Sequence, residues 1–409
     1  MVYRLLLLSF FSLSLGASEL TSVEEKLYNY IKKTQIKQHH ISRYIGTWPT
    51  YPKYSGARVE IAESNSFMTL QTIVLLKQVN EVYKLEGVEN IFSLANKQIQ
   101  NYVDDAKKTD EIKGTISFWP LIKTDEGKFI RSFDTKWYNS SMRILNIGND
   151  FDTSSQAFSW FYMTNTHEGF LDNFVKNVTL HVDKDRKNEH FSNTKWKGKD
   201  SGAFLTWAED EAPKKSNNRI MDLVNDVDCV VNLNILTALS NYENHIDSLP
   251  PKTQSTRENS CHLIKNVIKN HKEDICGTWY TRESHFYLAF AKAYKADTFC
   301  IADEKDEVLK RAKRKARELL NHPRLKAYTE IAEYIIIIKD LSKRRTYLTK
   351  ILLDDLEKEL KKGITEKEDY AYLPSRHSLF GGKAFKYFHF NWYGRANATA
   401  LALRALSMK

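Results

Sequence analysis

Residues 225–239, NDVDCVVNLNILTAL, decide the fold expected for this 409-residue chain. The Asn-Asp opening is typical of a helix N-cap, and the residues after it have the composition of a helix. Apolar side chains follow on almost every side of that helix instead of forming one stripe. Because a helix that is apolar on nearly all sides must be buried on all sides, this segment predicts a helix in the interior of a larger helical assembly.

The same unit recurs along the chain, which indicates an internal repeat. Four further segments rich in small and apolar residues begin at positions 62, 149, 282 and 394. Each of the five follows a short Gly-and-Trp segment: GTWPTY (46–51), GTISFWP (114–120), SGAFLTWAED (201–210), CGTWYT (276–281) and HFNWYG (389–394). A sixth apolar helix is predicted at residues 328–341, without the Trp segment, so the count of interior helices is six.

Amphipathic, charged helices alternate with the apolar ones. Residues 90–108 and 306–320 place apolar side chains at i, i+3 and i+4, while strand-like alternation is scarce. An inner ring of apolar helices covered by an outer ring of amphipathic ones satisfies both patterns. We therefore predict an all-α fold, an α/α toroid of about six helix pairs, in which parallel inner helices bring their N-termini together at one end, the mouth.

The N-terminus predicts export. Arg4, the apolar run LLLLSFFSLSLG (5–16), and the small residues Ala17 and Ser18 form the pattern of a secretory signal peptide over residues 1–18. No later stretch has the length of apolar sequence that a membrane span needs. Residues 19–409 are then expected to form a single toroid domain in a secreted or periplasmic protein.

Composition and motifs exclude several classes of function. The chain is 42% apolar with a net charge of +10, and the basic excess lies along Lys-rich helical faces. A solvated surface is the main interpretation of that charge, and attraction to an anionic glycan, lipid or cell surface is the alternative. The sequence has no Gly-rich phosphate loop, HExxH, paired CxxC or nucleophile elbow, so we expect no cofactor, no metal and no nucleic-acid partner.

The four cysteines of an exported chain allow three pairings. Cys261 and Cys276 bracket a short hairpin-like segment, which favours that pair and leaves Cys229 with Cys300. The alternative is that Cys229, set in an apolar helix, is a reduced core residue.

Two Asn-Asp-x-Asp signatures provide the candidate catalytic residues. They open two different inner helices and contribute Asp150, Asp152, Asp226 and Asp228. If the signatures face one another, crowded carboxylates raise each other's pKa, so that one can act as a general acid beside a base or nucleophile. Cleavage of a glycosidic bond requires such a pair. The alternative interpretation is helix capping and packing.

Other side chains are expected around the same mouth. Glu63 and Glu283 occupy corresponding positions of two other inner helices, His285 and His389 lie in aromatic segments, and Arg395 would add a positive charge. Rings near the mouth could stack on sugar faces or form the wall of an apolar pocket. These aromatic residues are Trp48, Trp119, Trp207, Tyr280, Trp392 and Tyr393. For each residue, a structural role in the repeat is the alternative.

These segments resemble the inner helices of the terpene cyclase and protein prenyltransferase toroids, whose squalene cyclase-like repeats also carry Gly-Trp loops. The resemblance lies in the repeated order of Gly-Trp loop and apolar helix, which extends over most of the mature chain. Six-hairpin glycosidases and some polysaccharide lyases share a related ring of helix pairs. The resemblance implies an active site at one end of the ring without deciding the chemistry.

The family motifs match in part. Class II terpene cyclases carry Asp-x-Asp-Asp, in which the middle Asp protonates an alkene, and here the candidates read DFDT and DVDC. Asp152 and Asp228 fill the donor position, but Thr153 and Cys229 stand where the last Asp is expected. The prenyltransferase zinc motif, Asp-x-Cys with a later His, is not reproduced, since Asp228 and Cys229 are adjacent.

The leading hypothesis from sequence is therefore an exported carbohydrate-active enzyme, a glycoside hydrolase or polysaccharide lyase, with an acidic site at one end of the toroid and a glycan or other small molecule as substrate. The alternatives are an isoprenoid-handling protein like the terpene cyclases and prenyltransferases, or a non-catalytic binding or structural toroid. The lining of the cavity distinguishes them: open and polar for sugar, closed and apolar for isoprenoid, filled by side chains for structure.

Overall fold

The structure is a computed structural model, and it describes residues 19–39, 42–54, 63–108, 112–123, 127, 129–131, 149–183, 201–208, 227–277, 279–280, 282–322, 327–375, 380–385 and 388–409. The predicted signal peptide, residues 1–18, lies outside these residues, as does Asp226. Among the helices described, none combines the length and the apolar character that a membrane crossing needs.

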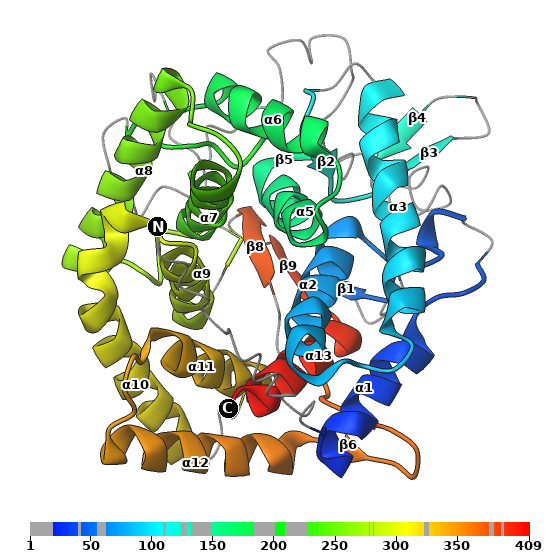
Figure 1. Cartoon of the computed structure of the whole chain (residues 1–409), viewed down its shortest axis with the longest axis vertical. Helices are drawn as coiled ribbons and strands as arrows, with labels where there is room; N and C mark the ends of the chain where they lie inside the picture. The colour runs from blue at the N-terminus through cyan, green and yellow to red at the C-terminus, as the bar shows by residue number, and fades with distance from the viewer. Residues whose placement is uncertain are drawn as a thin grey trace, which may run out of the picture.

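An inner ring of six helices forms the centre of the described structure (Figure 1). Each inner helix packs against the next around the ring, and the last packs against the first. In ring order they are α2 (Ser66–Tyr83), α5 (Phe151–Thr164), α7 (Cys229–His245), α9 (Glu283–Lys295), α11 (Tyr328–Leu341) and α13 (Arg395–Ser407). The prediction of an all-α toroid is confirmed.

Outer helices cover this ring and alternate with the inner ones along the chain (Figure 1). They are α1 (Ser22–Thr34), α3 (Val88–Lys108), α6 (Glu168–Asn177), α8 (Pro251–Lys269), α10 (Lys305–Asn321) and α12 (Tyr347–Gly363). Short 3-10 turns lie at Ser42–Tyr44 (η1), Val178–Leu180 (η3) and Phe299–Glu304 (η6). The inner helices are buried on nearly all sides and the outer ones on one face, as their apolar patterns require.

Strands occur only as short pieces in the described loops. β1 (Tyr51–Tyr54), β9 (Phe388–Tyr393) and β8 (Phe380–Phe385) form an antiparallel sheet in which Tyr51 pairs with Tyr393. Three two-stranded ladders pair β2 (Ile116–Ser117) with β5 (Asn149–Asp150), β3 (Leu121–Lys123) with β4 (Phe129–Arg131), and β6 (Thr365–Glu366) with β7 (Ala371–Tyr372). The first sheet joins the Trp segments of the first and last repeats and so helps to close the ring.

Asx caps fix where three inner helices begin. The side chains of Asn65, Asp150 and Asp228 accept hydrogen bonds from the first backbone N–H groups of α2, α5 and α7. These bonds satisfy donors that a helix start leaves without a partner. Because all three starts follow Gly-Trp loops, the caps place the ends of these helices at the mouth, as the sequence predicts.

The glycines of two Gly-Trp segments have a steric role. Gly46 and Gly114 have φ of +92° and +82°, where L side chains are rare. A Cβ atom at Gly46 would overlap the backbone carbonyl of Leu94, and one at Gly114 would overlap the backbone at Phe174. Glycine therefore lets these two loops lie directly against outer helix α3 and outer helix α6.

The disulfide pairing expected from sequence is wrong. All four cysteines are bridged, but Cys229 pairs with Cys276 and Cys261 with Cys300, with Cα–Cα distances of 5.5 and 5.9 Å. The loop before α9 lies on the start of α7, where the backbone N–H of Cys229 donates to the carbonyl of Cys276 at 3.2 Å. Cys261 lies in α8, which packs against the η6 turn that carries Cys300. Proximity along the chain was misleading because ring packing decides which cysteines meet.

Candidate functional site

A pocket lies at the N-terminal ends of inner helices α2 and α5. We call it the aromatic pocket, because rings from several loops and helices form most of its lining. It is lined by Phe67, Phe118, Asp150, Asp152, Thr153, Thr206, Trp207, Trp279, Tyr280 and Trp392. Phe67 stacks on Phe118 with ring centroids 6.2 Å apart, and Trp207 meets Trp279 edge to face at 5.4 Å.

Asp152, in the first turn of α5, lines this pocket and is bonded to side chains of two other elements. Its Oδ1 accepts a hydrogen bond of 2.7 Å from Asn234 Nδ2, and its Oδ2 accepts a short one from the hydroxyl of Tyr280. Burial raises the pKa of Asp152 to about 6, although both hydrogen bonds favour the charged form. A carboxyl group with this pKa holds a proton for part of the time near neutral pH.

Asp150 faces the same pocket but is held by capping. Its Oδ1 accepts from the backbone N–H of Thr153 at 2.6 Å, and its Oδ2 accepts from the Thr153 hydroxyl at 2.8 Å. Burial, together with the nearby charge of Asp152, raises the pKa of Asp150 to about 8. At neutral pH this residue is predominantly uncharged.

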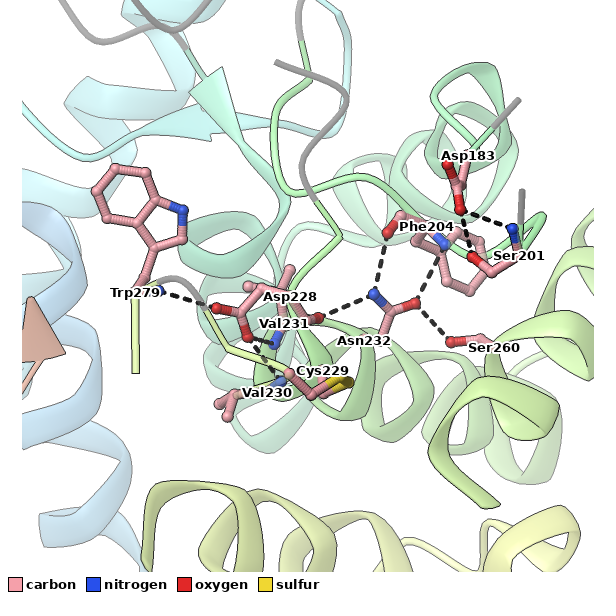
Figure 2. Close-up of a disulfide and its surroundings, with 11 residues drawn as sticks. Asp183, Ser201, Phe204, Asp228, Cys229, Val230, Val231, Asn232, Ser260 and Trp279 are labelled. Atoms are coloured by element: carbon pink, nitrogen blue, oxygen red, sulfur yellow. Dashed lines mark hydrogen bonds between the residues drawn. A yellow bond between two sulfur atoms is a disulfide. The ribbon is translucent and has the colours of Figure 1, made fainter. Parts of the chain in front are cut away.

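Asp228 does not line the aromatic pocket; it has a structural role at the start of α7 (Figure 2). Its Oδ1 accepts from the backbone N–H groups of Val230 and Val231 at 2.8 and 3.3 Å. Its Oδ2 accepts from the backbone N–H of Trp279 at 3.0 Å, which ties the loop before α9 to α7 next to the Cys229–Cys276 bridge. Of the four carboxylates expected to face one cavity, the structure therefore places Asp150 and Asp152 at the aromatic pocket and Asp228 outside it.

Glu63 is an anchor for the Trp segments. It is 2% exposed and accepts from the indole N–H groups of Trp119 and Trp392, the latter at 2.9 Å. Thr50 and Asn65 donate to it as well, at 2.9 and 3.0 Å. Burial raises the pKa of Glu63 while these bonds lower it. The residue therefore orients Trp392 at the pocket, and we assign it no contact with substrate.

The aromatic residues expected at the mouth lie in different parts of the structure. Trp207, Tyr280 and Trp392 line the aromatic pocket. Trp48 is 2% exposed and donates from its indole to the carbonyl of Ile31 in α1 at 2.9 Å, so it packs between inner and outer ring. Trp119 is fully buried behind the pocket wall.

The remaining candidates mostly lie away from the pocket. Glu283 forms an ion pair with Lys315 of α10 at 3.0 Å, on the outer side of α9. The exposed Arg395 guanidinium lies 5.9 Å from the ring centre of Tyr51, the strand partner of the half-buried Tyr393. His389 lies in β9, but its side chain is outside the described part of the structure.

His285 is brought to a second cavity, on the axis of the ring, which we call the axial chamber. Burial lowers the pKa of His285 to about 3, so its imidazole is neutral. The chamber is lined by Gln71, Val74, Leu75, Gln78, Gln156, Val230, Asn234, Tyr280, His285, Leu288, Ala289, Lys292, Glu333, Asn397 and Leu401. Tyr280 lines both the chamber and the aromatic pocket, so the two cavities adjoin.

Sequence reasoning missed several residues of these cavities. Phe67 and Phe118 were not singled out, nor was Trp279, although the last is the Trp of the CGTWYT segment. Lys292, Glu333 and Asn234 were missed too, but each is a polar residue within an otherwise apolar inner helix. That contrast was the available signal, because a buried helix face carries polar side chains only where they have a partner or a use.

No protein-family model matches the sequence, and neither does any curated protein. Among solved structures, the chain is similar to two structures of the type II terpene cyclase MstE from Scytonema. An arginine-to-alanine variant in complex with its substrate, geranylgeranyl dihydroxybenzoate, has a TM-score of 0.54 at 12% identity. A tyrosine-to-phenylalanine variant without ligand has a TM-score of 0.51 at 10% identity. Each comparison covers 94% of this chain and 97% of the other.

The chain has a terpene cyclase-like fold. At these identities the likeness establishes the architecture, and the chemistry has to be argued from the pocket. The comparison supports the isoprenoid alternative raised from sequence, and neither it nor the pocket supports the glycan-processing hypothesis, the leading one from sequence.

Proposed function

We propose that the protein is an acid-catalysed cyclase in which Asp152 protonates an alkene of an apolar, prenyl-type substrate held in the aromatic pocket. The observation that carries the proposal is the position of Asp152, a buried carboxyl group of raised pKa within a pocket lined by five aromatic rings besides Tyr280. It also fills the donor position of the Asp-x-Asp-Asp pattern that DFDT resembles.

The reaction balances without a cofactor. The O–H bond of protonated Asp152 breaks and a C–H bond forms at one alkene carbon, which leaves a carbocation at the other. A second alkene attacks that carbon and forms the ring bond, and transfer of a proton from a carbon next to the new cation to water ends the sequence. The product is an isomer of the substrate, and Asp152 regains its proton from solvent.

The lining of the pocket fits the charge that develops. Aromatic faces attract a cation through their quadrupoles, by about 0.5–2 kcal/mol per contact depending on how well water is excluded. Phe67, Phe118, Trp207, Trp279 and Trp392 supply such rings. The anchoring of Trp392 to Glu63 fixes one of them before substrate binds.

A glycosidase is disfavoured by the carboxyl groups themselves. Glycosidic cleavage needs two carboxyl groups that flank the bond, at about 5–9.5 Å from one another. Asp228 is occupied by backbone N–H groups outside the pocket, and Asp150 and Asp152 are neighbours on one helix start. The described residues thus offer the pocket two carboxyl groups from one helix start, of which Asp150 is held by capping, and no opposed pair.

The proposal is tested with a panel of acyclic prenyl alkenes, among them geranylgeraniol and geranylgeranoic acid, in D2O. The wild-type protein should yield an isomeric cyclic product carrying one deuterium at the protonated carbon, detected by mass spectrometry and NMR. Asp152→Asn keeps partners for Asn234 and Tyr280 but has no acidic proton, so turnover should fall at least a hundredfold. Glu283→Gln, outside the pocket, is the matched control. Unchanged turnover in Asp152→Asn, or no product from the wild type across the panel, would overturn the proposal.

We also propose that the protein acts outside the cytoplasm. The signal-like N-terminus motivates this, and two disulfides among the described residues are compatible with it. N-terminal sequencing of the mature protein tests it: a first residue near Ser18 or Glu19 supports export, whereas retention of Met1 contradicts it.

A further inference from the structure

The axial chamber is more polar than the packing of a helical ring requires. Each of the six inner helices contributes at least one polar side chain to it: Gln71 and Gln78 from α2, Gln156 from α5, Asn234 from α7, His285 and Lys292 from α9, Glu333 from α11 and Asn397 from α13. Apolar residues of similar size at these positions would pack without any cost of desolvation.

Several polar atoms in the chamber lack a partner within the described part of the chain. His285 is 6% exposed and Asn397 is 3% exposed. Neither ring nitrogen of His285 has a hydrogen-bond partner there, and neither does Nδ2 of Asn397. The Nε2 atom of His285 lies 3.5 Å from Oε1 of Glu333, without hydrogen-bond geometry. Because buried polar groups in proteins are almost always bonded, this concentration indicates a chamber shaped for a polar guest.

Lys292 adds a positive charge to this set. It interacts over a distance with Asp152, Glu333 and Asp340, but none of these lies within ion-pair distance of it among the described residues. Asp340 is instead paired with Lys295 at 3.0 Å. Lys292 thus lines the chamber without a contacting carboxylate among the described residues, and an anionic guest would supply a partner for its charge.

The two cavities can hold the two ends of one molecule. Tyr280 lines both, and the hydrogen bond between Asp152 and Asn234 joins the floor of the aromatic pocket to the wall of the chamber. A third cavity continues from the chamber, sharing Lys292 and Gln156 with it, toward the C-terminal ends of the inner helices, where it is lined by Met163 and Asn241. A chain that enters along the axis could therefore place an alkene beside Asp152 while its other end stays in the chamber.

We propose that the axial chamber binds the carboxylate end of the substrate, with Lys292 and Asn397 as its hydrogen-bond donors. The substrate class is then a prenyl-chain carboxylic acid. This inference rests on the proposed function, because it assumes that the alkene end occupies the aromatic pocket.

Binding is measured on Asp152→Asn protein, which cannot turn substrate over, by calorimetry and by quenching of the pocket tryptophans. The probes are geranylgeranoic acid, its methyl ester and geranylgeraniol. The acid should bind at least tenfold more tightly than the ester and the alcohol. Lys292→Met and Asn397→Leu, each added to Asp152→Asn, should remove most of that preference, and Lys310→Met, on the exposed face of α10, should retain it.

The outcomes separate this inference from the proposed function. Equal affinity for acid, ester and alcohol overturns the carboxylate site, and cyclisation of plain prenyl alkenes would still stand. Preferential binding of the acid without any cyclisation overturns the proposed function and leaves the carboxylate site standing. If Lys292→Met lowers the melting temperature but keeps the preference for acid, Lys292 only balances charge, and the assignment is overturned.

Discussion

At the scale of single residues, three aspartates at helix starts have different roles because of what their oxygens meet. Asp150 accepts from Thr153, Asp228 accepts from three backbone N–H groups, and Asp152 accepts from side chains of two other elements. The partners of Asp152 stand 82 and 128 residues away in the sequence. The shared Asn-Asp-x-Asp pattern therefore predicted two helix starts correctly, but it could not show which Asp caps its helix and which accepts hydrogen bonds from other elements.

Substitution of Asp228 should be costly even with Asn, which caps helices about as well as Asp in general. An Asn that keeps its oxygen on Val230 and Val231 turns its NH₂ group toward the backbone N–H of Trp279, so two donors face each other. We expect a loss of about 1–3 kcal/mol in the free energy of unfolding, measured by urea denaturation.

Asp150→Asn is the matched control for this measurement. Its NH₂ group can donate to the Thr153 hydroxyl while its oxygen still caps α5. At pH 4, where Asp150 still keeps nearly all of its contribution to stability, the variant should unfold at nearly the wild-type urea concentration. Equal stability of Asp228→Asn and the wild type would contradict the structural role assigned to Asp228.

At the scale of elements, the inner helices were predictable because burial on all sides leaves a clear pattern in sequence. The short strands and the cysteine pairing were not, since both depend on which loops the closed ring brings together. β1 and β9, for example, come from the two ends of the chain. Tyr280 could be named as an aromatic of the mouth, but its bond to Asp152 arises only when the loop before α9 lies over α5.

The Cys229–Cys276 bridge should stabilise both the start of α7 and the loop before α9. It spans 47 residues and holds the loop whose Trp279 and Tyr280 line the aromatic pocket. Replacing both cysteines with Ala should lower the free energy of unfolding by about 2–4 kcal/mol. It should also weaken binding of prenyl probes.

The Cys261→Ala, Cys300→Ala pair serves as comparison, because that bridge joins the outer helix α8 to η6. A similar loss of stability is expected there, with probe binding retained. Peptide mapping without reduction should recover the two crosslinks named above. A Cys261–Cys276 crosslink in the native protein would contradict the structure.

At the scale of the whole molecule, the buried aspartates make global stability depend on pH. The pKa of Asp150 is raised from 3.8 to about 8, so the folded state binds this proton more tightly than the unfolded state. Its contribution is fully present below about pH 4 and is lost as the pH rises through 8. Asp152, with a pKa of about 6, acts in the same direction over the lower part of this range.

The difference in unfolding free energy between wild type and Asp150→Asn isolates this effect. It should shift in favour of the variant by at most about 1.4 kcal/mol per pH unit between pH 4 and 8. Urea denaturation at each pH measures it. Parallel stability curves for the two proteins would show that Asp150 does not hold a proton in the folded state.

The closing of the ring by α13 bears on how the protein is made. The last inner helix, thirteen residues long, packs against α2, α11 and α1, and the strand before it carries Trp392 into the aromatic pocket. While these residues are still in the ribosome, the ring is open between α11 and α2. The apolar side chains that α13 covers in the finished protein are then exposed to water. The aromatic pocket is thus complete only after β9 and α13 have been made and have packed onto the ring. If the chain is exported as proposed above, the pocket would form only after these residues have crossed the membrane.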